Sequence, residues 1–238
     1  MNNLKAIRVF ICAMLFGTST LFAQNTSFFV SDPNDAANVK NALIDLNQKG
    51  VFSTLHKENI ATLSNEHQSY FKNNPQFDLL RYTQGNIFLN DKKDAAFVVY
   101  HKNEARVAIV LFNESENTYG ELYAQYPVVN ELKDVQLPYA YQGTLVYVLG
   151  STLMNIGMLL EGYPLGFLNR EPAPVSVYNI AKDPEFKGLK LGNLSKNIQK
   201  ADVKSCLCVE IDISDFSLEC LQYNADKKAF MLIYSIVK

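Results

Sequence analysis

Two apolar segments that flank a short polar turn constrain the fold more than any other feature of this sequence. Residues 95–101 and 105–112 are rich in valine, alanine, isoleucine and phenylalanine, and Lys102-Asn103-Glu104 separates them. β-branched and aromatic residues are favoured in strands, and two such runs joined by three polar residues are typical of a β-hairpin. The chain is therefore predicted to contain antiparallel sheet.

Further segments have the same character on both sides of this hairpin. They are short, apolar or alternating, and bounded by turn residues, which is the pattern of strands in a meander. The C-terminal members are joined by predicted turns at 214–215 and 225–227. The six predicted strands cover residues 77–84, 87–89, 121–129, 207–213, 216–223 and 229–237.

The N-terminal part of the chain is helical in pattern. Ser31-Asp32-Pro33 combines capping side chains with a proline at the first helical position, where the missing N–H has no cost. Apolar residues then recur on one helical face until Gly50. A second helical stretch is predicted between residues 57 and 72, with His67 on its apolar face. Helices first and strands later predict an α+β fold, with N-terminal helices packed on a largely antiparallel sheet.

Residues 1–23 have the order of features that is typical of a secretory signal peptide. Lys5 and Arg8 precede an apolar run, and the small residue Ala23 fits the pocket of a signal peptidase. The alternative, a lipid anchor at Cys12, lacks the small residue that would precede such a cysteine. We therefore expect cleavage after Ala23 and a mature protein that is periplasmic or secreted.

The mature chain, residues 24–238, is expected to form a single α+β domain, and the prolines near 170–175 mark a boundary if it divides into two lobes. The charge-free stretch 144–160 contains Asn155 and is slightly short for a membrane span, so a buried strand and helix is the favoured interpretation. The mature chain carries 20 basic and 24 acidic residues. Without clustered Lys and Arg, nucleic acid is not an expected partner.

Three cysteines remain after cleavage: Cys206, Cys208 and Cys220. In an oxidising compartment, a disulfide between Cys220 and one of the other two is expected, and one thiol is then left over. The alternative, a metal site at Cys206 and Cys208, lacks the second pair of ligands that zinc needs. The sequence leaves the choice of disulfide partner open.

The segment 85–99 resembles the calcium-loop β-repeats of the FG-GAP or VCBS type, in which a Gly-Asp-x-Asn-x-Asp-Gly-x-x-Asp loop precedes an apolar strand. The resemblance implies a calcium site formed by Asn86, Asn90 and Asp94. The chain departs from the pattern because Phe88 occupies a ligand position and only Asp94 keeps a carboxylate. Calcium needs six to eight oxygen ligands. A metal-free polar turn is therefore favoured, and no cofactor is expected.

Tyrosine is concentrated in one window of the chain, whereas tryptophan is absent. Tyrosine combines a rigid apolar ring with a hydroxyl group and suits protein-binding surfaces. Tyr119, Tyr123 and Tyr126 are therefore predicted to contact a protein partner, with packing in the core as the alternative. The function that we expect is that of an exported, non-catalytic binding protein, with an inhibitor-like or immunity-like role.

Catalysis has weaker support in the sequence, and no catalytic residue is assigned. Ser151 follows a glycine but lacks the Gly-x-Ser-x-Gly pattern of a hydrolase elbow. A cysteine could meet one of the three histidines in space. The alternative functions are therefore a secreted hydrolase with a Cys or Ser nucleophile and a calcium-stabilised β-repeat module.

Overall fold

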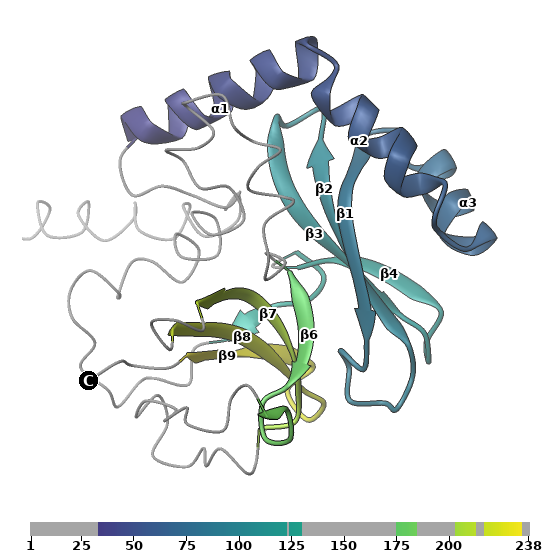
Figure 1. Cartoon of the computed structure of the whole chain (residues 1–238), viewed down its shortest axis with the longest axis vertical. Coiled ribbons are helices and arrows are strands. Elements are labelled where there is room, and N and C mark those ends of the chain that lie inside the picture. The colour runs from purple at the N-terminus through teal and green to yellow at the C-terminus, as the bar shows by residue number, and fades with distance from the viewer. Residues whose placement is uncertain (1–32, 123, 130–174, 185–202, 213–216, 235–238) are drawn as a thin grey trace, which may run out of the picture.

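The structure, a computed structural model, describes residues 33–122, 124–129, 175–184, 203–212 and 217–234 (Figure 1). The predicted signal peptide, the stretch 144–160 and most of the boundary region 170–175 lie outside these ranges, and so does Tyr123. No helix in the described ranges is long and apolar enough to cross a bilayer.

Three helices begin the described chain: α1 (Pro33–Gln48), α2 (Val51–Ile60) and α3 (Asn65–Asn73). The first predicted helix is confirmed as α1. The second predicted stretch differs, because α2 begins earlier and the chain breaks before α3. Ser64 explains the break, since its hydroxyl accepts a hydrogen bond from the backbone N–H of His67 (3.4 Å) and caps α3.

The first sheet is antiparallel and has the strand order β1-β2-β3-β4. Its central hairpin is confirmed, with Ala95 opposite Phe112 and His101 opposite Arg106. Residues 87–89, predicted as a strand, form a loop instead, and Leu89 has a positive φ of 56°. The strands are β1 (Phe77–Gly85), β2 (Asp94–His101), β3 (Arg106–Asn113) and β4 (Thr118–Glu121).

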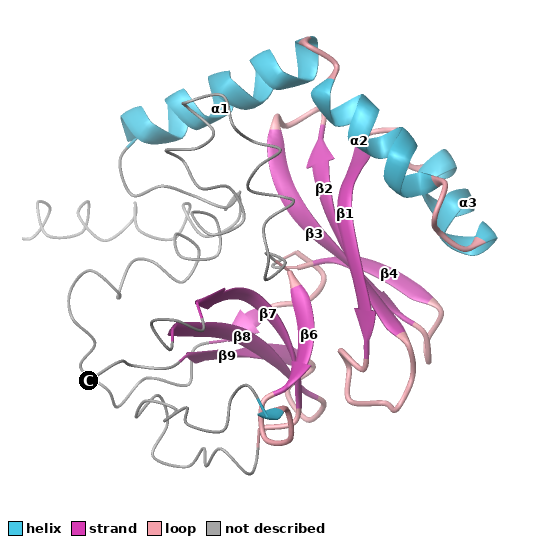
Figure 2. Cartoon of the chain, viewed as in Figure 1, coloured by secondary structure: helices cyan, strands magenta, loops and turns pink. Residues whose placement is uncertain are grey.

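The second sheet has the order β5-β9-β8-β7-β6, and β5 is parallel to β9. Figure 2 shows its strands β6, β7, β8 and β9. The predicted C-terminal meander is confirmed as the antiparallel strands β7, β8 and β9. The segment predicted as one strand over 121–129 instead turns after Glu121 and forms β5 at its end. The strands are β5 (Val128–Val129), β6 (Ser176–Asn179), β7 (Ser205–Asp212), β8 (Ser217–Asn224) and β9 (Ala229–Tyr234).

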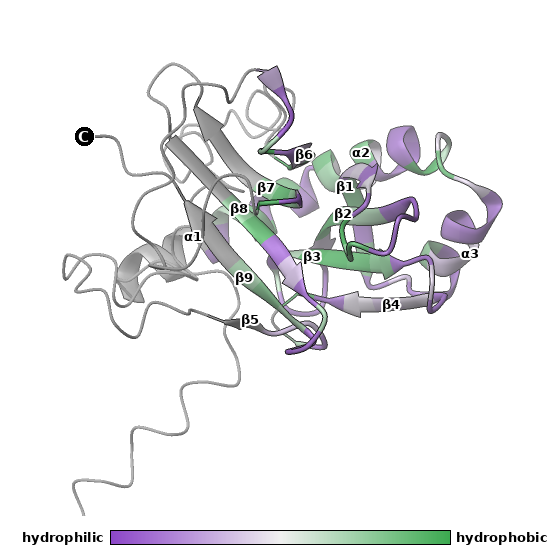
Figure 3. Ribbon diagram, turned by 90° about the horizontal axis from the view of Figure 1, so that it is seen from below, coloured by the Kyte–Doolittle hydropathy of each residue, from purple (hydrophilic) through white to green (hydrophobic). Residues whose placement is uncertain are grey.

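The core lies on both faces of the first sheet. Helices α2 and α3 lie on the side of the first sheet that faces away from the second sheet. Hydrophobic residues are concentrated in the strands that lie between these helices and the second sheet (Figure 3). Phe97 on β2 packs against Phe71 of α3, with ring centroids 5.4 Å apart. Phe88, in the loop before β2, packs against Phe230 of β9 at 5.5 Å. The α+β prediction is confirmed, and one cluster of buried residues includes members of both sheets.

The outer edge of β1 is closed by side chains of α2. His56 Nδ1 accepts the backbone N–H of Leu79 (2.9 Å), and Asn59 Nδ2 donates to the carbonyl of Leu80 (3.0 Å). At Leu79 and Leu80 these bonds replace those that a neighbouring strand would form, so α2 covers this part of the edge.

Candidate functional site

Tyr119 lies on β4, at the end of the strand order of the first sheet. Its ring stacks on that of Tyr70 from α3, with centroids 3.8 Å apart and planes 7° apart. Both side chains are half-buried. Tyr70 and Tyr119 are called the tyrosine face below. Two rings held in parallel contact form a rigid apolar surface that retains hydroxyl groups for polar contacts.

His67 supports the tyrosine face from beneath. Its ring is 4 % exposed and contacts Phe97 and Phe112 edge to face, with centroids 5.0 and 4.9 Å apart. His67 Nδ1 lies 2.6 Å from the Tyr119 hydroxyl oxygen. The two atoms share one hydrogen bond, in which the tautomer of the imidazole determines the donor. Helix α3 and strand β4 are thus joined through one partly buried hydrogen bond.

Burial sets the protonation of this cluster. It raises the pKa of Tyr70 to about 12, with a smaller contribution from the charge of Glu121. The pKa of Tyr119 is also raised, by burial first and then by Glu66 and Tyr70. The pKa of His67 is lowered by burial, which outweighs the opposite effect of Glu66. At neutral pH all three rings are therefore uncharged.

Tyr126, the other described member of the predicted tyrosine site, lies elsewhere. A side chain on Gly120 would place its Cβ 2.6 Å from Tyr126 Cε2, so Tyr126 lies directly against this glycine. Its ring also contacts Phe88, with centroids 5.0 Å apart. Successive residues of a strand point to opposite faces. Tyr119 and Tyr126 therefore lie on opposite faces of β4, and the structure does not bring them together.

The side chains that the calcium-loop resemblance implies form a polar network. The Asp94 carboxylate is fully buried and accepts three hydrogen bonds, from Phe88 N (2.9 Å), Asn90 Nδ2 (3.1 Å) and Glu114 N (3.0 Å). Asn86 Oδ1 accepts the backbone N–H of Asp91 (3.1 Å). Protein donors thus occupy the oxygens that a cation would use. Over the described ranges, no group of three or more His, Cys, Asp or Glu side chains could hold a metal ion.

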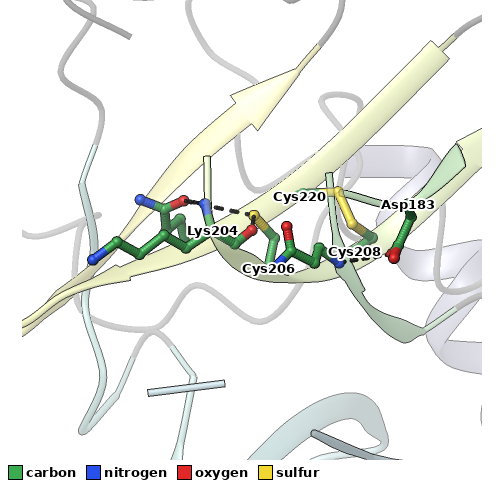
Figure 4. The surroundings of a disulfide bond; sticks show 7 residues. Asp183, Lys204, Cys206, Cys208 and Cys220 are labelled. Carbon is green, nitrogen blue, oxygen red and sulfur yellow. Dashed lines mark hydrogen bonds between the residues drawn. A yellow bond between two sulfur atoms is a disulfide. The ribbon is translucent and has the colours of Figure 1, made fainter. Parts of the chain in front are cut away.

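The cysteines lie on neighbouring strands of the second sheet (Figure 4). Cys208 on β7 is bonded to Cys220 on β8, directly opposite in the register. Among the described cysteines, Cys206 is the free one, and it is buried. Its Sγ lies 3.3 Å from the carbonyl oxygen of Lys204. Burial raises the pKa of Cys206 to about 12, so the side chain stays a protonated thiol at neutral pH.

The other two histidines, His56 and His101, form different contacts from those of His67. His56 accepts the Leu79 N–H, and its Nδ1 lies 3.8 Å from a carboxylate oxygen of Asp78. The same carboxylate pairs with Lys102 Nζ at 2.9 Å. Burial lowers the pKa of His56, although Asp78 acts in the opposite direction. His101 Nε2 lies 3.5 Å from a carboxylate oxygen of Glu104.

Sequence reasoning missed Tyr70, whose signal is its position three residues after His67 on the same helix face. It also missed Asn113, whose Oδ1 accepts three hydrogen bonds beside Asp94. No protein-family model, no curated protein and no solved structure matches this chain.

Proposed function

We propose that this protein is an exported, non-catalytic binding protein and that the tyrosine face contacts a protein partner. The observation that carries the proposal is the stacked pair of Tyr70 and Tyr119, half-buried and fixed from beneath by His67. A side chain that is already held in one rotamer loses little conformational entropy when a partner binds. Tyrosine is enriched among the residues that dominate binding energy.

The contacts of the cysteine and histidine side chains support the non-catalytic part of the proposal. Cys206 is a buried thiol whose raised pKa keeps it protonated, whereas a nucleophilic cysteine needs a lowered pKa. His56 and His67 both use Nδ1 in structural hydrogen bonds. These contacts favour a structural role for each side chain.

Export is supported by the N-terminal leader and by the bond between Cys208 and Cys220, since disulfides persist in oxidising compartments. The location is periplasmic or secreted. The mature chain has more acidic than basic residues, which favours a protein over a nucleic acid as the partner.

The test uses the mature protein, residues 24–238, with its disulfide intact. Envelope proteins that it captures are identified, purified and titrated against the wild type and two variants, Tyr70→Ala and Tyr126→Ala. Tyr126 is a matched control because it is a half-buried tyrosine on the opposite face of β4. Melting temperatures establish that each variant is folded.

Tyr70→Ala is expected to weaken binding by more than about 30-fold, which corresponds to a hot-spot loss of about 2 kcal/mol. Tyr126→Ala is expected to change it by less than about three-fold. Equal affinities of all three proteins would contradict the assignment of the tyrosine face. Covalent labelling of folded protein at Cys206 by a thiol-directed substrate analogue would contradict the non-catalytic assignment.

A further inference from the structure

Helix α2 packs against β1, and the strand contains a bulge where the two elements meet (Figure 1). Leu79 lies opposite Val99 of β2 and Arg81 lies opposite Val98, so Leu80 between them is an extra residue without a partner on β2. A bulge interrupts the ladder of hydrogen bonds between two strands. The backbone of β1 therefore needs other partners at this point.

Two side chains of α2, three positions apart on one helix face, provide these partners. His56 Nδ1 accepts the backbone N–H of Leu79 (2.9 Å), and Asn59 Nδ2 donates to the carbonyl of Leu80 (3.0 Å). A backbone N–H is only ever a donor, so the first contact determines the state of the ring. His56 Nδ1 carries the lone pair, and the imidazole is neutral.

This contact is incompatible with a protonated His56. An imidazolium carries hydrogen on both ring nitrogens, so two N–H donors would then face each other across 2.9 Å. The donor and the acceptor cannot exchange roles, because the Leu79 amide nitrogen has no lone pair to offer. The Asp78 carboxylate is another acceptor for the new N–H, since its Oδ1 lies 3.8 Å from the same ring nitrogen and its side chain is only 6 % exposed. A shift of about 1 Å would bring these two atoms within hydrogen-bond distance.

Several elements place charged or titratable groups around His56. Burial has the largest effect on the pKa of His56 and lowers it, whereas Asp78 on β1 raises it and Lys102, in the turn after β2, lowers it. Lys102 Nζ lies 2.9 Å from the same Asp78 oxygen, but Lys102 is 38 % exposed, so its ammonium can turn into water when the imidazolium approaches. The other neighbours of His56 or Asp78 are the Tyr100 phenol on β2, the Phe71 ring on α3, and the exposed side chains of Lys57 and Glu58 on α2.

We propose that His56 is a pH-sensitive switch between α2 and β1: on taking up a proton from water at Nδ1, its ring leaves the Leu79 N–H and turns to the Asp78 carboxylate, so that acid opens one of the two bonds at the bulge. Asn59 does not titrate, so its bond to Leu80 remains and the opening is local. The switch belongs to the folded chain alone. It requires no partner and is independent of the proposed function.

The first readout is the hydrogen bond itself. Nitrogen NMR of the isotope-labelled mature protein detects an N–H···N hydrogen bond as a scalar coupling between its two nitrogens. We expect this coupling between Leu79 N and His56 Nδ1 at pH 8, and we expect it to disappear as the His56 ring titrates on the way to pH 4.5. A coupling that persists at pH 4.5 would overturn the proposal.

The second readout is hydrogen exchange at the Leu79 amide. The Lys102 amide is the internal control, because it donates to the carbonyl of Gln76 (2.9 Å), an acceptor that does not titrate. Between pH 7.5 and pH 4.5 the protection factor of Leu79 relative to that of Lys102 should fall by about five-fold, as expected for the loss of one hydrogen bond. A ratio that stays constant, with both amides exchanging together, would contradict a local release.

Three variants assign the step to His56. His56→Gln retains a hydrogen-bond acceptor and does not titrate, so the Leu79 ratio should become independent of pH. Asp78→Asn removes the charge that favours the imidazolium, so the transition should move to lower pH; with the two wild-type readouts, it tests the switch even if His56→Gln fails to fold. His101→Gln removes the histidine beside Glu104 and should leave the transition unchanged. A transition that remains in His56→Gln would overturn the proposal.

Discussion

The two sheets of this protein hold their strands together by different means. In the first sheet, side chains bond to the backbone: the Asp94 carboxylate accepts two backbone N–H groups beside β2, and His56 accepts one at the edge of β1. In the second sheet, a covalent bond joins Cys208 on β7 to Cys220 on β8. The first arrangement depends on hydrogen-bond acceptors and the second on redox conditions. The two sheets should therefore fail under different treatments.

The largest expected effect is in the first sheet, for Asp94→Ala. The change leaves the backbone N–H groups of Phe88 and Glu114 without their acceptor, whereas the amide of Asn90 keeps its hydrogen bond to Asn113 Oδ1. Each buried donor without a partner costs about 1–3 kcal/mol. We expect a loss of about 4 kcal/mol in the free energy of unfolding, measured by urea titration of the mature protein.

Asp91→Ala is the matched control, because Asp91 is exposed and lies in the same loop. It should cost less than about 1 kcal/mol. Chelator and added calcium should leave the melting temperature of the wild type unchanged, since protein donors already occupy Asp94. If calcium raises the melting temperature of the wild type and Asp94→Ala abolishes that rise, the result would instead support the calcium-stabilised module.

The second sheet is tested by removing its disulfide. In Cys208→Ala/Cys220→Ala the unfolded chain gains the freedom of a loop that spans 12 residues, and the expected loss is about 3 kcal/mol. A reducing agent should lower the stability of the wild type by the same amount and leave the double variant unaffected. Cys206→Ala, which removes only the free thiol, should remain sensitive to the reductant. Insensitivity of that variant would show that Cys206 belongs to the bond.

Much of this fold could be predicted from the sequence where local pattern and tertiary structure agree. The two strands of the hairpin over residues 95–112 are apolar over most of their length because both faces of β2 and β3 are covered. The helix break before Ser64 was missed because the apolar face continues through it to Phe71. At that point the cap that Ser64 forms on α3 starts a new helix, although the apolar periodicity predicts a continuous one.

The candidate site could be predicted only in part, because proximity in sequence was a poor guide to proximity in space. Tyr119 and Tyr126 are seven positions apart but lie on opposite faces of β4, whereas Tyr70, 49 positions earlier, stacks on Tyr119. The choice of Cys208 over Cys206 likewise follows from strand register, in which Cys208 faces Cys220. No composition or motif specifies that register.

Substitutions at the contact between the two sheets are expected to have a smaller effect on the free energy of unfolding. Gly85 on β1 lies against β6, and a Cβ at this position would be 2.7 Å from Val177 Cγ1. Gly85→Ala must therefore displace β6, which we expect to cost about 2 kcal/mol. Val177→Ala alone should cost about 1 kcal/mol, and the double variant should be more stable than Gly85→Ala alone. A double variant whose losses simply add would show that the sheets do not meet at this point.

The smallest expected effect concerns pH and the edge of β1. Burial lowers the pKa of His56 in the folded protein, so the unfolded chain takes up a proton at a higher pH. Stability from this group is thus complete above the ordinary histidine pKa of about 6.5 and declines as pH falls below it. His56→Gln retains an acceptor for Leu79 N–H without titrating, so it should flatten the decline between pH 7 and pH 5. Denaturant titrations at pH 8, 7, 6 and 5 measure the slope, and an unchanged slope in His56→Gln would show that His56 does not contribute to it. The disulfide variant should keep the wild-type slope, because the bond that it removes does not titrate.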